Sequence, residues 1–60
     1  MKMGSHEMEK AARIIRNHYG LSRKVTVDEV RAEIANIERR RDAGSLDDGY
    51  FRLASALRLL

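Results

Sequence analysis

The chain contains no cysteine, no proline and no tryptophan, and it has only one phenylalanine and two tyrosines. Without cysteine, neither a disulfide nor a thiolate metal site can form. His6 and His18 are far apart in sequence and neither has a second ligand at helical spacing, so we expect no metal ion and no other cofactor. With so few aromatic side chains, we expect no platform on which nucleic-acid bases stack.

Long apolar runs are also missing, since none approaches the roughly 18 residues of a membrane span. The polar, methionine-rich N-terminus lacks the apolar centre of a signal peptide, so we expect a cytoplasmic protein without a membrane partner. The run "GSH" at positions 4–6 is typical of a cloning remnant. We therefore predict that residues 1–7 are a disordered remnant and that one domain spans residues 8–60.

The chain has 60 residues, which is enough for a single domain. A domain of this size buries only about 60% of the surface that its unfolded chain exposes, so its stability is marginal. Small domains usually gain stability from disulfides, a metal ion or a partner subunit. Because the first two are not expected here, the sequence favours tight helix packing or self-association.

Helical periodicity, with apolar residues three or four positions apart, occurs three times, and no long stretch alternates apolar and polar residues as a strand does. The first apolar stripe includes Met8, Ile15 and Tyr19 and predicts a helix over about 7–19. Gly20 is well placed to end this helix, because glycine adopts a positive φ without a Cβ clash.

The second predicted helix, over about 26–43, has the clearest start. The run "TVDE" that opens it has the pattern of a capping box. In that motif the Thr26 hydroxyl accepts from the Glu29 amide, and the Glu29 carboxylate accepts from the Thr26 amide. Gly44 is predicted to mark the end of this helix.

A third helix is predicted over about 46–59, with Ser45 as its N-cap and the acidic residues Asp47 and Asp48 in its first turn. Gly49 interrupts this pattern at a cost of about 1 kcal/mol relative to alanine. The predicted connections are about five and about two residues long, and short connections favour antiparallel neighbours. The predicted fold is therefore all-α, with three short helices in an antiparallel bundle or an open array.

The run "GLSRKVTVDEV" between the first two predicted helices resembles the turn of a helix-turn-helix DNA-binding motif. Gly20, Leu21, Ser22 and Val30 match that motif, whereas Thr26 stands where an aliphatic residue is usual. The preceding "ARIIRNHYGL" is similar to the start of the DNA-binding domain of bacterial replication initiators, although the basic signature of that family is missing. This resemblance implies DNA binding. We favour an ordinary capped helix start, because the capping box is the more specific pattern.

The C-terminal half, "EIANIERRRDAGSLDDGYFRLASALRLL", resembles the short helical hairpins known as SHOCT domains. Spaced aliphatic residues precede Gly44, an acidic stretch follows it, and Phe51 and the closing pair Leu59-Leu60 complete the pattern. Gly49 departs from it, because an acidic residue is usual at this position. The resemblance implies a role in interaction or oligomerisation rather than in catalysis.

The sequence offers no convincing catalytic constellation. Ser22, Ser45 and Ser55 have no nearby histidine to activate them, and the four glycines are too scattered for a phosphate loop. The run "VDEVRAEIANI" resembles the opening of helical chorismate mutases, in which Arg31 would face an anionic substrate. Gly44 breaks the long continuation that this family needs. We therefore predict that the protein is not an enzyme.

Self-association, with a homodimer as the expected assembly, is the leading functional prediction. Adjacent residues on a helix point about 100° apart, so one small core cannot easily bury both members of two adjacent apolar pairs. The apolar side chains that this core cannot bury are predicted to form an interface with a second copy, or with another protein. The predicted interface residues are Ile14, Ile15, Tyr50, Phe51 and Leu57.

DNA binding is the alternative. The net charge is +3 with a sequence pI near 9.8, and one stretch carries five cations without an acidic residue among them. These cations are predicted to contact phosphates, and they are Lys10, Arg13, Arg16, Arg23 and Lys24. Acidic residues at helix starts and basic residues at helix ends also complement the helix dipoles, which explains most of the pattern without any ligand.

Overall fold

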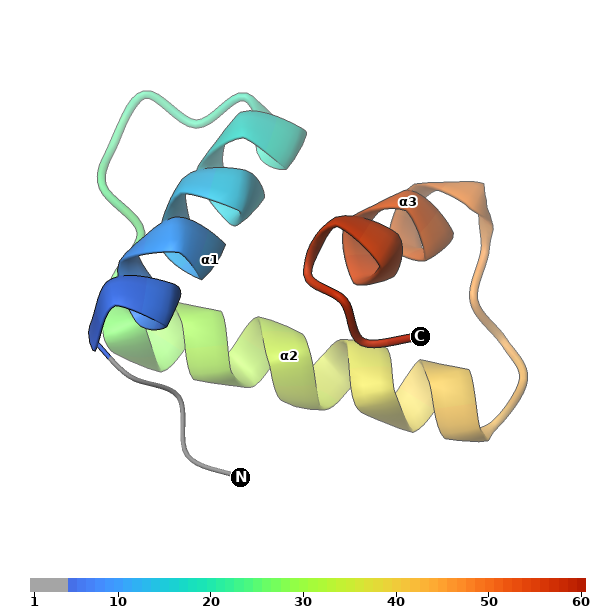
Figure 1. The fold of residues 1–60 in the computed structure, drawn as a ribbon. Coiled ribbons are helices and arrows are strands. Elements are labelled where there is room, and N and C mark those ends of the chain that lie inside the picture. Colours follow the sequence, from blue (N-terminus) through green and yellow to red (C-terminus); the bar gives the residue numbers. More distant parts are fainter. Residues whose placement is uncertain (1–4) are drawn as a thin grey trace.

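A computed structural model of the protein describes residues 5–60, and in that range it contains three α-helices and no strand (Figure 1). The helices are α1, Ser5–Tyr19, α2, Val27–Asp42, and α3, Asp48–Ala56. The prediction of an all-α fold is thereby confirmed. Of the predicted remnant, residues 1–4 lie outside the described range, and residues 5–7 form the first turn of α1. Across 5–60, no helix combines the length and the apolar character that a membrane crossing demands.

The loop after α1 runs back along the length of α1 before α2 begins, so α1 and α2 are not an antiparallel pair. The seven residues 20–26, here called the return loop, lead from the end of α1 back to its beginning (Figure 1). Seven extended residues span about 23 Å, and a helix of 15 residues is about 22 Å long, so the loop is long enough for this return. As a result, α1 and α2 begin at the same corner of the molecule and diverge from it.

The third helix occupies the space that opens between the other two. It runs in the opposite direction to α2, as the short connection predicted, and its backbone lies closer to α1 than to α2 (Figure 1). The Cα atoms extend over 29 × 27 × 16 Å, so the three helices form a flat and open array.

The hydrophobic core joins all three helices and the return loop. Val25 is buried although it lies in the loop, because the loop packs against the corner where α1 and α2 begin. No polar or charged side chain is buried within the described range. The buried side chains are Ala11, Ile15, Val25, Val30, Ile37, Leu53, Ala54 and Leu57. Because this core is so small, each of its members matters for stability.

The start of α2 confirms the predicted capping box. The Thr26 hydroxyl accepts a hydrogen bond from the Glu29 amide over 3.2 Å, and the Glu29 carboxylate accepts one from the Thr26 amide over 3.0 Å. The two contacts satisfy two backbone N–H groups that the helix itself leaves without partners.

The start of α3 differs from the prediction, because its N-cap is Asp47 rather than Ser45. The Asp47 carboxylate accepts from the Tyr50 amide over 2.9 Å, and the helix ends at Ala56, earlier than predicted. Ser45 instead completes the turn that ends α2, in which its amide donates to the Arg40 carbonyl over 2.8 Å. Ser45 therefore belongs to the end of one helix and not to the start of the next.

Each helix ends in a turn with one residue in the left-handed conformation. Gly20 and Gly44 occupy this position after α1 and α2 with φ values of 66° and 70°, and Arg58 occupies it after α3 with a φ of 59°. The amide of Leu59 then donates to the Ala54 carbonyl over 2.8 Å, which closes the last turn. A residue with a Cβ atom adopts this conformation at a cost of about 1–2 kcal/mol. The end of α3 is therefore strained in a way that the two glycines avoid.

Candidate interaction surfaces

The five residues predicted for self-association do not share one exposed surface. Ile15 and Leu57 belong to the core of the single chain, so a second copy cannot reach them. Ile14 and Tyr50 are half-buried against that core, and only Phe51 is exposed, with 53% of its surface accessible. In each pair of adjacent apolar residues, Ile14–Ile15 and Tyr50–Phe51, one side chain is more buried than the other.

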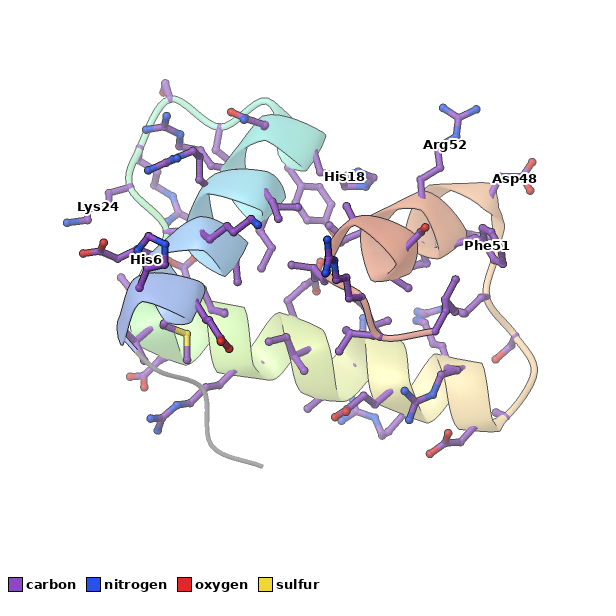
Figure 2. All side chains as sticks on the ribbon, viewed as in Figure 1. His6, His18, Lys24, Asp48, Phe51 and Arg52 are labelled. Atoms are coloured by element: carbon purple, nitrogen blue, oxygen red, sulfur yellow. The ribbon has the colours of Figure 1, made fainter. Side chains whose placement is uncertain are left out.

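Phe51 lies on the outer end of α3, where Asp48 and Arg52 also point into solvent (Figure 2). Lys24, in the return loop, lies at the opposite end of the molecule (Figure 2). An exposed aromatic ring on a small domain is unfavourable in water unless a partner covers it.

Tyr50 has a structural role in a polar network that links the three helices. Its hydroxyl accepts from the Asn36 amide group over 3.3 Å, and the Arg40 guanidinium lies 4.4 Å from the centre of its ring. Nearby, the Tyr19 hydroxyl of α1 donates to the Glu33 carboxylate of α2. Burial and this contact raise the pKa of Tyr19 above its ordinary value. The network therefore holds Tyr50 in place within the single chain.

The five cations predicted to contact phosphates are all exposed, but one of them is already paired. The Arg23 guanidinium donates to both carboxylate oxygens of Glu29, over 2.8 and 2.6 Å. The hydrogen bond from Arg23, followed by that from the Thr26 amide, lowers the pKa of Glu29 to about 2, and the same contact raises the pKa of Arg23. Arg23 thus strengthens the start of α2.

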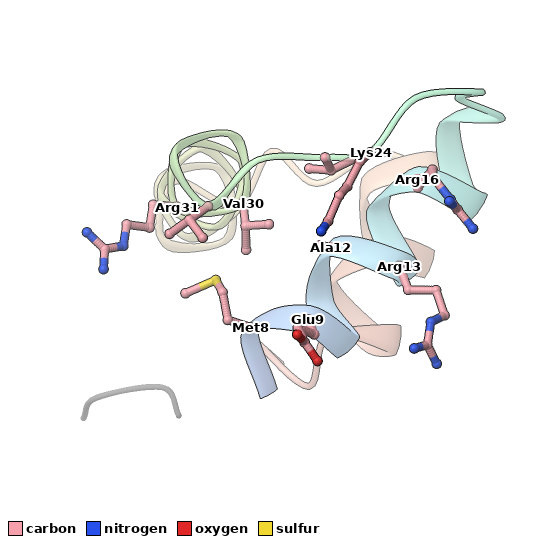
Figure 3. Close-up of a pocket in the computed structure, with 10 residues that line it drawn as sticks. Met8, Glu9, Ala12, Arg13, Arg16, Lys24, Val30 and Arg31 are labelled. Atoms are coloured by element: carbon pink, nitrogen blue, oxygen red, sulfur yellow. The ribbon is translucent and has the colours of Figure 1, made fainter. Parts of the chain in front are cut away.

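A groove of about 660 Å³ opens between one side of α1, the return loop and the first turns of α2 (Figure 3). Four basic side chains line it, Arg13, Arg16, Lys24 and Arg31, together with a single acidic one, Glu9. The groove also has an apolar floor formed by Met8, Ala12, Val25, Val27 and Val30. Lys24 reaches from the loop toward α1, and Arg13 and Arg31 extend outward on either side (Figure 3).

The groove could not be recognised from the sequence, because it depends on the path of the return loop. Met8 and Val27 line the same hollow although 18 residues separate them in the chain. The resemblance to helical chorismate mutases implies that Arg31 faces an anionic substrate. The structure places Arg31 on the lining of this open groove, on the opposite side from Arg13 (Figure 3). A surplus of basic residues in this part of the sequence was the only available signal.

Residues 5–60 contain no group of three or more histidine, aspartate or glutamate side chains that could hold a metal ion. The fold and its surfaces define a small all-α chain with a cationic groove at one end and an exposed aromatic ring at the other. Comparison with models of known protein families, with curated protein sequences and with solved structures gave no match.

Proposed function

We propose that the protein is a small, non-enzymatic helical interaction module that associates with copies of itself, with a dimer as the smallest assembly. The exposed ring of Phe51 is the observation that supports this proposal, because 53% of its surface stays in contact with water in the single chain. Aromatic side chains, phenylalanine among them, are enriched in protein interfaces relative to the rest of the surface. Self-association would also compensate for the small core.

The size of the exposed ring suggests weak association. Half of a phenylalanine side chain corresponds to about 100 Å². Burial of this area on two copies contributes about 5 kcal/mol, which is near the lower end of the roughly 4–15 kcal/mol lost on association. Phe51 is therefore an anchor that needs neighbouring contacts, and we expect dissociation in the micromolar range or above.

Light scattering coupled to size exclusion tests the proposal on the wild type and on Phe51→Ser. We expect the wild type to self-associate at high micromolar concentration and Phe51→Ser to stay monomeric. The control is Leu60→Ser, which removes an apolar side chain that is 59% exposed outside α3. A wild-type protein that is monomeric at high micromolar concentration would contradict the proposal.

Duplex DNA is the second candidate partner, favoured by four unpaired cations. Lys10, Arg13, Arg16 and Lys24 are exposed, and none is within 4.0 Å of a carboxylate in the described part of the chain. Contacts to phosphates would make binding fall steeply with salt. The return loop is longer than the three- to four-residue turn of a helix-turn-helix motif, so this candidate depends on charge alone.

Fluorescence anisotropy with a labelled duplex tests this second candidate. If DNA is a partner, Gln replacements of Arg13, Arg16 and Lys24 should abolish binding while circular dichroism shows unchanged helices. Submicromolar binding near physiological salt that depends on these three cations would favour DNA over self-association.

A further inference from the structure

Part of the apolar floor of the groove is open to water in a single chain. Val27 is 49% exposed, and Met8 and Ala12 are half-buried, whereas Val25 and Val30 belong to the core. The volume of about 660 Å³ falls within the range of about 300–1,000 Å³ that is usual for binding sites. An apolar side chain that enters the groove would therefore remove unfavourable surface from water on both partners.

The walls of the groove are strongly positive. Four cations and one carboxylate give it a formal charge of +3, and none of the four cations is within 4.0 Å of a carboxylate in residues 5–60. The N-termini of α1 and α2 meet at the same corner, where the acidic first-turn residues Glu7, Asp28 and Glu29 offset the positive ends of the two helix dipoles (Figure 1). The positive charge of the groove thus comes from its four cations. The groove therefore fits a partner that is apolar at its tip and acidic around it.

The outer end of α3 has this chemistry. Phe51 is exposed, and Asp48 lies three residues before it, so both side chains share one face of the helix. Asp47 lies just before Asp48, and Arg52 is the one basic residue of α3, so this end carries a formal charge of −1. A duplex would match the charge of the groove but would leave the apolar floor without a partner.

We propose that the protein assembles head to tail, with Phe51 and the acidic start of α3 of one copy in the groove of the next. The groove and Phe51 lie at opposite ends of the molecule, so a chain cannot fill its own groove (Figure 2). In an open assembly of this kind, one groove and one Phe51 stay unoccupied at the two ends. Such an interface produces an open chain or a closed ring rather than a dimer with twofold symmetry.

This inference rests on the proposed self-association and adds the second surface that Phe51 contacts. Two variants disable one surface each. Phe51→Ser removes the inserted ring. The groove variant combines Val27→Asp, which puts a carboxylate at the floor, with Arg16→Glu. Val27→Asp puts an acidic residue in the first turn of α2, where it complements the helix dipole. Arg16→Glu changes an exposed residue but opposes the dipole at the end of α1, so circular dichroism must show unchanged helices in this variant.

Mixing the two variants is the decisive experiment, with mass measured by light scattering. We expect the wild-type mass to rise beyond that of a dimer with concentration, and each variant alone to associate at least about tenfold more weakly. An equimolar mixture should form a one-to-one complex and stop there, because only one intact groove and one intact Phe51 meet. Arg39→Glu, the matched control, changes an exposed arginine in the last turn of α2 and should behave as the wild type.

The outcomes separate the two proposals. If the wild type associates and the mixture stays monomeric, the head-to-tail arrangement is wrong, and a symmetric contact through Phe51 remains. If the wild type is monomeric, both proposals fail. If the groove variant loses binding to an acidic amphipathic peptide or to a duplex but still self-associates as the wild type does, the groove serves another partner and the inference is overturned.

Discussion

The start of α2 and the helix α3 are stabilised in different ways. The first residues of α2 bind one another, since Thr26 and Glu29 exchange hydrogen bonds and Arg23 holds the Glu29 carboxylate with two more. By contrast, α3 has nine residues, a single N-cap contact from Asp47 and a strained residue, Arg58, after its end. Polar contacts between neighbours in sequence define the first region and are sparse in the second.

What α3 has instead is burial. Two residues of α3, Leu53 and Ala54, lie in the core, and so does its C-cap residue, Leu57. Isolated helices shorter than about 12–15 residues are marginal in water, so a helix of nine residues persists only through such packing. The comparison teaches that local polar contacts determine where a helix begins, whereas burial determines whether a short helix exists at all.

Removal of core packing from α3 should have the largest effect. Leu53 is 1% exposed, and Leu53→Ala should lower the free energy of unfolding by about 2–5 kcal/mol. A domain of this length has a total stability of only about 3–9 kcal/mol, so most of the population should unfold at moderate urea concentrations. Urea unfolding followed by circular dichroism measures the change. A loss below about 1 kcal/mol would show that α3 does not depend on the core.

The two N-caps provide the next comparison. Thr26→Ala should lower the free energy of unfolding by about 0.5–2 kcal/mol, and Asp47→Ala by about 1 kcal/mol. In a domain of this size, about 1 kcal/mol shifts the melting midpoint by about 4–8 °C. Ser45→Ala is the control, because its side chain caps no helix start and makes only a long contact of 3.5 Å to the Arg40 carbonyl, so the midpoint should stay nearly unchanged. If Ser45→Ala costs more than Asp47→Ala, the assigned start of α3 is wrong.

Relief of the strain after α3 should stabilise the protein. Arg58→Gly removes the cost of a Cβ atom at positive φ, which is about 1–2 kcal/mol, and adds the greater flexibility of glycine in the unfolded chain, which offsets part of the gain. We expect a net increase of about 0.5–1 kcal/mol in the free energy of unfolding. Thermal melting measures it, and Arg58→Ala, which keeps the Cβ atom, should show no such increase.

The smallest expected effect is a dependence on acid. The pKa of Glu29 is about 2 in the folded chain, against an ordinary value of 4.5. Folding therefore favours the ionised carboxylate, whose contribution is complete above the ordinary pKa and is lost as the pH falls through this window toward the folded value. We expect the melting midpoint of the wild type to fall more between these two values than that of Glu29→Gln. Equal falls would mean that the contact with Arg23 does not couple to folding.

The start of α2 could be predicted from the sequence to the residue, because a capping box is written in four consecutive positions. The start of α3 could not, because Ser45 and Asp47 are both good caps. The choice between them depends on the turn at Gly44, which uses the Ser45 amide to end α2. Competition between two helix ends for the same residues is not visible in a local pattern.

The candidate surfaces were less predictable than the helices. Helical spacing predicts that Ile15 lies on an apolar stripe of the first helix, but it does not tell which stripe faces a neighbouring helix. The structure buries Ile15 and Leu57 in the core and leaves Phe51 exposed. The groove and the pairing of Arg23 with Glu29 both depend on how the return loop crosses the molecule, and a chain path of this kind has no signature in composition or periodicity.

The return loop also determines how tightly α1 is retained. Residues 20–26 act as a tether that keeps α1 at a high effective concentration next to α2. Arg23 and Lys24, both exposed within it, are cleavage points for trypsin. A single cut there would turn an intramolecular contact into an association between two fragments. Because α1 has only 15 residues and is marginal by itself, it should leave the nicked protein at micromolar concentration, and α2 and α3 should lose the core that it completes.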